Sequence, residues 1–110
     1  MALYFLTNTP NKLLSSIKKA VDDKKIVTWS YDVDGDFTHT VAQWKNRAWL
    51  RPEIMSDRLA FFIIKPQRIN VSTTVYGIYH GRFLESVLTH LDSIFTAARA
   101  SSMPEGKDNI

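Results

Sequence analysis

Ten residues near the middle of the chain, 43–52 (QWKNRAWLRP), place two tryptophans five positions apart among three cationic side chains. Indole and guanidinium groups stack on nucleic-acid bases, and they also anchor many protein–protein contacts. Residues 45–82 carry seven Lys or Arg and two Asp or Glu, so a local charge of +5 stands within a total of +3. This region of the sequence is therefore a candidate binding surface.

The other residue types that carry chemistry do not form a recognisable site. The 110-residue chain has no cysteine, and His39, His80 and His90 lack the HxxxH or HxxE spacing of a metal site. A contact between Ser30 and His39 across a hairpin would lack the orienting acid of a catalytic triad. We predict a non-catalytic protein with no catalytic residues, no metal and no cofactor.

Residues 79–83 (YHGRF) precede a long apolar stripe that predicts a helix. The first N–H groups of a helix carry partial positive charge and hold anions. His80 and Arg82 would add side-chain donors, and Gly81 would allow close approach of the backbone. We keep His80, Gly81 and Arg82 as a candidate anion site. The alternative is a glycine that only starts the helix beside a solvated arginine.

Two amphipathic helices are predicted from apolar residues at i, i+3 and i+4 spacing. The first covers residues 10–24, with Thr9 or Asn8 as the cap and Pro10 at the first helical position. The second begins near residue 83. Its apolar stripe consists of Phe83, Leu84, Val87, Leu88, Leu91, Ile94, Phe95 and Ala98.

The remaining segments alternate apolar and β-branched residues, which predicts strands. These strands cover residues 2–6, 26–31, 37–44, 47–51 (ended by Pro52), 59–65 and 69–75, and Gly77 is expected to form a bulge or a point of close approach. The order predicts an α+β fold: a two-layer sandwich in which an antiparallel meander of about five strands carries the N-terminal and C-terminal helices on one face. We expect one domain over residues 1–100 and a flexible tail over residues 101–110.

Two-residue turns at residues 34–35 and 45–46 would fix which side chains share a side of the sheet. Ala48 and Leu50 suit the helix-covered side because they are small or aliphatic. The uncovered side would then carry Val27, Trp29, Tyr31, Trp44, Arg47, Trp49 and Arg51. The covered side would carry Ile26, Thr28, Phe37, His39, Val41, Ala48 and Leu50.

Two alternatives to this arrangement stay open. Asn46 in the left-handed region would lengthen the second turn and slip the register by one residue. Tryptophan is also mostly buried in proteins, so the indoles can belong to the core instead of a binding site.

We predict a small binding module that acts through Trp29, Trp44, Arg47, Trp49 and Arg51. The expected partner is another protein or a second copy of the chain, as in a homodimer. One alternative is single-stranded nucleic acid on the same face, and another is a small enzyme or anion-binding protein at His80–Arg82. No apolar run approaches the ~20 residues that a membrane span needs, and no signal peptide is evident, so a cytoplasmic protein is expected.

Overall fold

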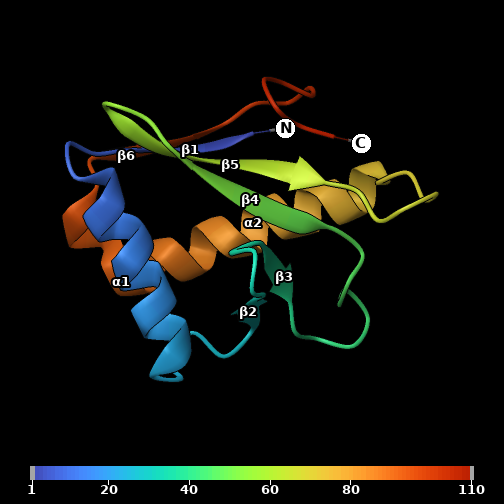
Figure 1. The fold of residues 1–110 in the computed structure, drawn as a ribbon, viewed down its shortest axis with the longest axis horizontal. Helices are drawn as coiled ribbons and strands as arrows, with labels where there is room; N and C mark the ends of the chain where they lie inside the picture. Colours follow the sequence, from blue (N-terminus) through green and yellow to red (C-terminus); the bar gives the residue numbers. More distant parts are fainter. Residues whose placement is uncertain (1, 110) are drawn as a thin grey trace.

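The computed structural model describes residues 2–109 and forms a six-stranded antiparallel sheet with two helices on one face (Figure 1). The spatial order of the strands is β2-β3-β4-β5-β1-β6. The predicted α+β class and two-layer arrangement are confirmed. None of the helices in the described part of the chain is long and apolar enough to cross a membrane. In chain order the elements are β1 (Leu3–Leu6), α1 (Pro10–Asp22), β2 (Trp29–Tyr31), β3 (Phe37–His39), β4 (Trp49–Ile54), β5 (Arg58–Ile64), α2 (Thr73–Leu91), a 3₁₀ turn (Asp92–Ile94) and β6 (Ala97–Ala100).

Helix α1 begins where the sequence predicts. Thr9 is the N-cap and Pro10 occupies the first turn, where its missing N–H leaves no helical hydrogen bond unmade. Leu13, Ile17 and Ala20 are buried on one face of the helix. Their spacing turns this face toward the sheet.

Helix α2 begins ten residues earlier than predicted. The Ser72 hydroxyl accepts a hydrogen bond from the Val75 N–H at 3.2 Å and caps the helix. Val75, Tyr79 and Phe83 are buried at i, i+4 spacing, so one stripe continues from the cap into the predicted helix. The predicted strand at 69–75 is therefore wrong, and Gly77 lies within α2. The cap and the buried stripe outweigh the local preference of β-branched residues for strands.

The end of the second predicted helix is a strand instead. Helix α2 ends at Leu91, and after a 3₁₀ turn the chain becomes extended at Phe95. In β6, Ala98 pairs with Phe5 of β1. Pairing with β1 therefore overrides the helical preference of the alanine-rich sequence.

Strand β4 runs through Pro52 to Ile54, although the sequence predicts an end at the proline. The Met55 N–H donates to the Arg58 carbonyl at 3.0 Å. Because hydrogen-bonded and non-hydrogen-bonded pairs alternate along antiparallel strands, Pro52 stands in a pair that makes no hydrogen bond to β5. Its nitrogen points toward β3, whose pairing with β4 is confined to Leu50. Proline is tolerated there because no ladder donor is needed.

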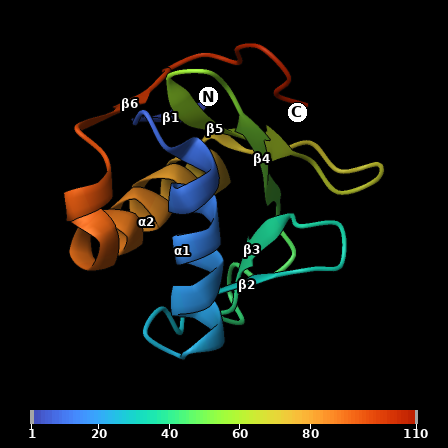
Figure 2. The same cartoon turned by 60° about the vertical axis from the view of Figure 1, so that its left-hand side comes forward.

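Aromatic rings fill the layer between the sheet and the helices. The Phe83 ring of α2 lies 4.7 Å from Phe61, 4.9 Å from Trp29 and 5.5 Å from Phe37 between centroids. Such edge-to-face pairs contribute about 0.5–1.5 kcal/mol each beyond their burial. Figure 2 shows both helices on the same side of the sheet, around this main core.

The opposite side of the sheet, which we call the outer face, has a small apolar cluster of its own. Ala2, Tyr4, Ala60 and Phe62 are buried there. Residues 101–109, the C-terminal segment, cover this cluster and lie away from α1 and α2 (Figure 1).

Hydrogen bonds join the C-terminal segment to β1 and β5. The Tyr4 hydroxyl donates to Glu105 Oε2 at 2.7 Å. The Asn109 N–H donates to the Ile63 carbonyl at 2.8 Å, and the Lys65 N–H donates to the Asn109 carbonyl at 2.7 Å. The sequence predicts a flexible tail here. The structure shows these hydrogen bonds to the segment. Its flexibility in solution stays a prediction.

Candidate functional site

The loop between β2 and β3 changes the predicted register. It spans residues 32–36 in place of a two-residue turn, so Trp29 pairs with His39 and not with Thr40. The Asp32 carboxylate accepts hydrogen bonds from two N–H groups of the loop, those of Asp34 and Asp36, each at 3.0 Å. These bonds stabilise the longer loop.

As a consequence, Trp29 lies in the core and not on the predicted binding surface. A one-residue slip turns every side chain of a strand to the other face. The Trp29 side chain is 2% exposed and its ring lies 5.4 Å from that of Tyr79 on α2. The predicted placement of Trp29 beside the arginines is therefore wrong.

Trp44 and Arg47 belong to the loop between β3 and β4. Asn46 has a φ of +58°, in the left-handed region, and the Arg47 N–H donates to the Trp44 carbonyl at 3.2 Å, so a turn with Lys45 and Asn46 at its centre does form. The Tyr79 hydroxyl donates to the Trp44 carbonyl, and the half-buried Trp44 ring packs against the main core. Arg47 is exposed. The predicted continuation of the two strands up to this turn is wrong, because β3 pairs with β4 only at Phe37 and Leu50.

Trp49 and Arg51 lie on the outer face, as predicted. Leu50 between them is fully buried in the main core, and side chains alternate along a strand. Arg51 pairs with Phe62 of the apolar cluster on the outer face, and Trp49 pairs with Ile64 at the end of β5. Trp49 is only partly exposed, yet it belongs to neither core cluster.

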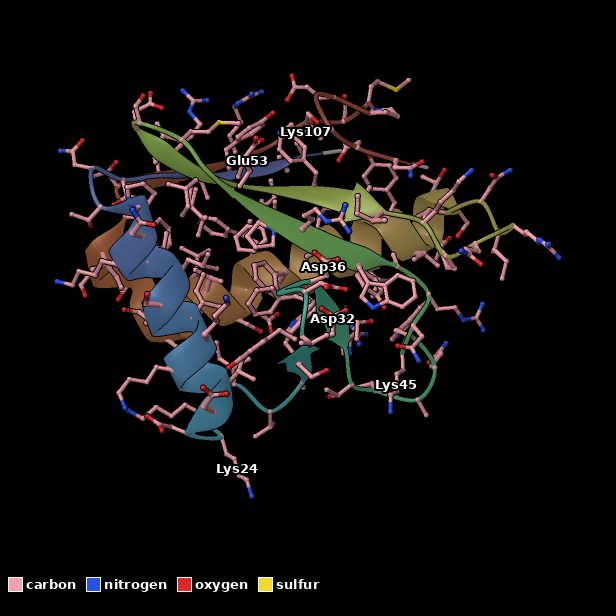
Figure 3. The ribbon with its side chains drawn as sticks, in the orientation of Figure 1. Lys24, Asp32, Asp36, Lys45, Glu53 and Lys107 are labelled. Carbon is pink, nitrogen blue, oxygen red and sulfur yellow. The ribbon has the colours of Figure 1, made fainter. Side chains whose placement is uncertain are left out.

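The guanidinium of Arg51 is held in one orientation by Asp36. Arg51 Nε and Nη2 donate to the two carboxylate oxygens of Asp36 at 3.0 and 2.8 Å. This bidentate hydrogen bond raises the pKa of Arg51, and the nearby carboxylates of Asp34 and Asp32 raise it further. Asp36 is buried while half of the Arg51 side chain is exposed, so a carboxylate from the protein positions a cation at the surface. Figure 3 shows Asp32 and Asp36 close together near β4.

We call Trp49, Arg51 and Asp36 the outer-face site. The C-terminal segment limits it on one side, where Lys107 forms an ion pair with Glu53 of β4 (Figure 3). The site therefore combines a partly exposed indole, an oriented guanidinium and acidic side chains. That composition suits recognition of a protein surface.

His80, Gly81 and Arg82 lie in the middle of α2 and not at a helix start. Their N–H groups are therefore inside the helix and not free to bind an anion. His80 is buried and its Nδ1 bonds to the Tyr76 carbonyl at 2.8 Å. The helix boundary assumed for the anion site is wrong.

Sequence reasoning missed a pocket beside the β2–β3 hairpin. The His39 pocket has a volume of about 340 Å³ and is lined by Thr28, His39, Val41, Arg82, Glu85 and Ser86. The Val41 N–H donates to His39 Nδ1 at 3.2 Å, which places the proton of the neutral ring on Nε2. Among residues 2–109, that buried Nε2 has no hydrogen-bond partner.

Acid is expected to destabilise the fold through His39. Burial lowers the pKa of His39, and nearby Arg82 lowers it further. The unfolded chain therefore binds a proton that the folded chain resists. The contribution of neutral His39 to the free energy of unfolding should be fully present above about pH 7. It should decrease as the pH drops below about 6.5. Chemical denaturation at about pH 7.5 and about pH 5.5 measures this decrease in the free energy of unfolding.

The variant His39→Gln should show a smaller decrease, and the exposed-site variant His90→Gln should show the same decrease as the wild type. An equal fall in wild type and His39→Gln would refute this role.

Comparison of the chain with protein-family models, with curated proteins and with solved structures finds no match. Among residues 2–109, no group of three or more His, Asp or Glu side chains is placed to hold a metal ion.

Proposed function

We propose that the protein is a non-catalytic binding module that associates with a second copy of itself through the outer-face site. The observation that carries this proposal is the position of Trp49. This indole is half-buried on the sheet face opposite the helices, outside both core clusters and beside an oriented arginine. Tryptophan and arginine are the side chains most enriched at the centres of protein interfaces.

The charges around the site favour a second copy as the partner. A two-fold interface brings a surface patch against itself, so the patch must complement itself. Arg51 supplies positive charge, and the exposed Asp32 and Asp34 supply negative charge close to it. Each copy can therefore place its acidic loop opposite the arginine of the other, with Trp49 near the two-fold axis.

The alternative of single-stranded nucleic acid is less well supported by this arrangement. Base stacking needs a row of exposed aromatic rings along a basic groove. Trp29 is in the core and the Trp44 ring packs against it, which leaves Trp49 as the one tryptophan of the outer face. Oligonucleotide binding that weakens steeply with added salt would support this alternative instead.

Sedimentation equilibrium over a series of protein concentrations tests the proposal. The wild-type chain should form dimers as the concentration rises. Trp49→Ala should weaken the association about tenfold or more, because the variant loses the central indole of the interface. Leu88→Ala is a matched control, since Leu88 is an apolar residue of α2 that is 46% exposed. The control should dimerise like the wild type.

Two results would contradict the proposal. If the chain stays monomeric at every concentration, the proposed self-association does not occur. Equal dimerisation of the wild type and a folded Trp49→Ala variant would place the interface elsewhere.

A further inference from the structure

The His39 pocket lies on a different part of the molecule from the outer-face site. Its lining comes from the chain just before β2, from the end of β3 and the loop after it, and from α2, which runs beside the hairpin in Figure 1. Its volume of about 340 Å³ falls within the range of about 300–1,000 Å³ typical of small-molecule sites. Apart from Val41, every side chain that lines it is polar or charged.

Two opposite charges line this pocket without an ion pair among residues 2–109. Arg82 and Glu85 are three residues apart on α2, so they lie on neighbouring positions of one helix face. In the described part of the chain, neither takes part in an ion pair, with the other or with a third residue. The Arg82 guanidinium contacts the ring of Trp44, at 6.0 Å from its centroid. That contact leaves the N–H groups at the edge of the guanidinium for other acceptors.

The pocket also has neutral hydrogen-bonding groups. Thr28 and Ser86 contribute hydroxyls, each of which can donate and accept. His39 is 1% exposed and contributes a wall whose Nε2–H lacks a partner among residues 2–109. A buried donor without a partner costs free energy. Val41 is 40% exposed and offers an apolar contact.

We propose that the His39 pocket binds a small amino-acid-like zwitterion. Its carboxylate contacts Arg82 and its ammonium group contacts Glu85, while Val41 packs against its short side chain. Arginine suits this role because its planar fork matches the two oxygens of a carboxylate. A doubly charged phosphate would meet the Glu85 carboxylate, and a simple amine would meet the Arg82 guanidinium. The pair of charges therefore selects a ligand that carries both signs.

A titration followed by ¹⁵N NMR of the full chain tests this proposal. Each of the twenty standard amino acids is added at about 10 mM, and a binder is then compared with its matched amine and carboxylic acid. For leucine these are 3-methylbutylamine and 4-methylpentanoate, and inorganic phosphate is a fourth probe. The expected result is saturable shifts of the Thr28, Val41 and Ser86 amide signals with an amino acid. The three other probes should bind about tenfold more weakly or not at all.

Variants of the two charges locate the binding. Arg82→Gln and Glu85→Gln should each weaken amino-acid binding about tenfold or more, and both positions are exposed, so folding is not at risk. Asp23→Asn is the control, because Asp23 is an acidic residue paired with Lys19 on α1. Trp49→Ala should also bind the amino acid normally, which separates this proposal from the proposed function.

The absence of saturable shifts with all twenty amino acids would overturn the proposal of a zwitterion site. Equal binding of the matched amine, acid or phosphate, or unchanged binding by both charge variants, would do the same.

Discussion

Replacement of Trp29 by alanine is expected to lower the free energy of unfolding by about 3–5 kcal/mol, the usual cost of deleting a large buried aromatic side chain. The Trp29 ring is 2% exposed and contacts the rings of Tyr79, Phe83 and His39 at 4.9–5.4 Å. The substitution would remove all three ring contacts at once and leave a cavity between the hairpin and α2. Urea denaturation followed by circular dichroism measures the change.

Trp49→Ala is the matched control for this experiment. It removes the same side chain from a partly exposed position outside both core clusters, so the expected loss is about 1 kcal/mol or less. A Trp29→Ala variant that is as stable as Trp49→Ala would show that Trp29 does not lie between the sheet and α2.

Gly106→Ala is expected to detach the C-terminal segment from the outer face and to cost about 1–3 kcal/mol. Gly106 has a φ of +59°, a backbone conformation that glycine adopts without the steric cost of a Cβ. An added Cβ would also lie 2.6 Å from Cε1 of the Phe62 ring, which is buried and has little room to move. The two penalties act on the same residue.

Hydrogen exchange shows where this change acts. The Ile63 N–H donates to Asp108 Oδ1 at 2.9 Å and the Lys65 N–H to Asn109, so both amides should exchange faster in Gly106→Ala. Gly77→Ala is the control, because a Cβ at this helical glycine meets no atom within 4 Å. It should stabilise the chain by about 0.5–1 kcal/mol. Unchanged exchange of both amides in Gly106→Ala would show that the segment is not bound there.

Features with strong local signals could be predicted from the sequence. Pro10 and the apolar stripe that follows it fixed the start and the buried face of α1. In β4, the apolar Leu50 between two amphipathic side chains indicated which face meets the helices. That pattern placed Trp49 and Arg51 correctly on the outer face.

Features that depend on longer loops or on distant partners could not be predicted. The Asp32 carboxylate holds a five-residue loop where Asp34-Gly35 indicates a two-residue turn, and this difference moved Trp29 to the other side of its strand. Glu105 accepts a hydrogen bond from Tyr4, which lies 101 residues away in the sequence. The His39 pocket likewise combines residues from separate parts of the chain, so no local pattern indicated it.

Self-association through the outer-face site is tested most directly by following the three indole N–H signals of the ¹⁵N-labelled chain during dilution. Trp44→Phe and Trp49→Phe variants assign the signals. We expect the Trp49 signal to shift with protein concentration as dimers dissociate, while the signal of buried Trp29 stays in place. A Trp49 signal that does not move while the chain dissociates, or a Trp29 signal that moves in its place, would contradict this expectation.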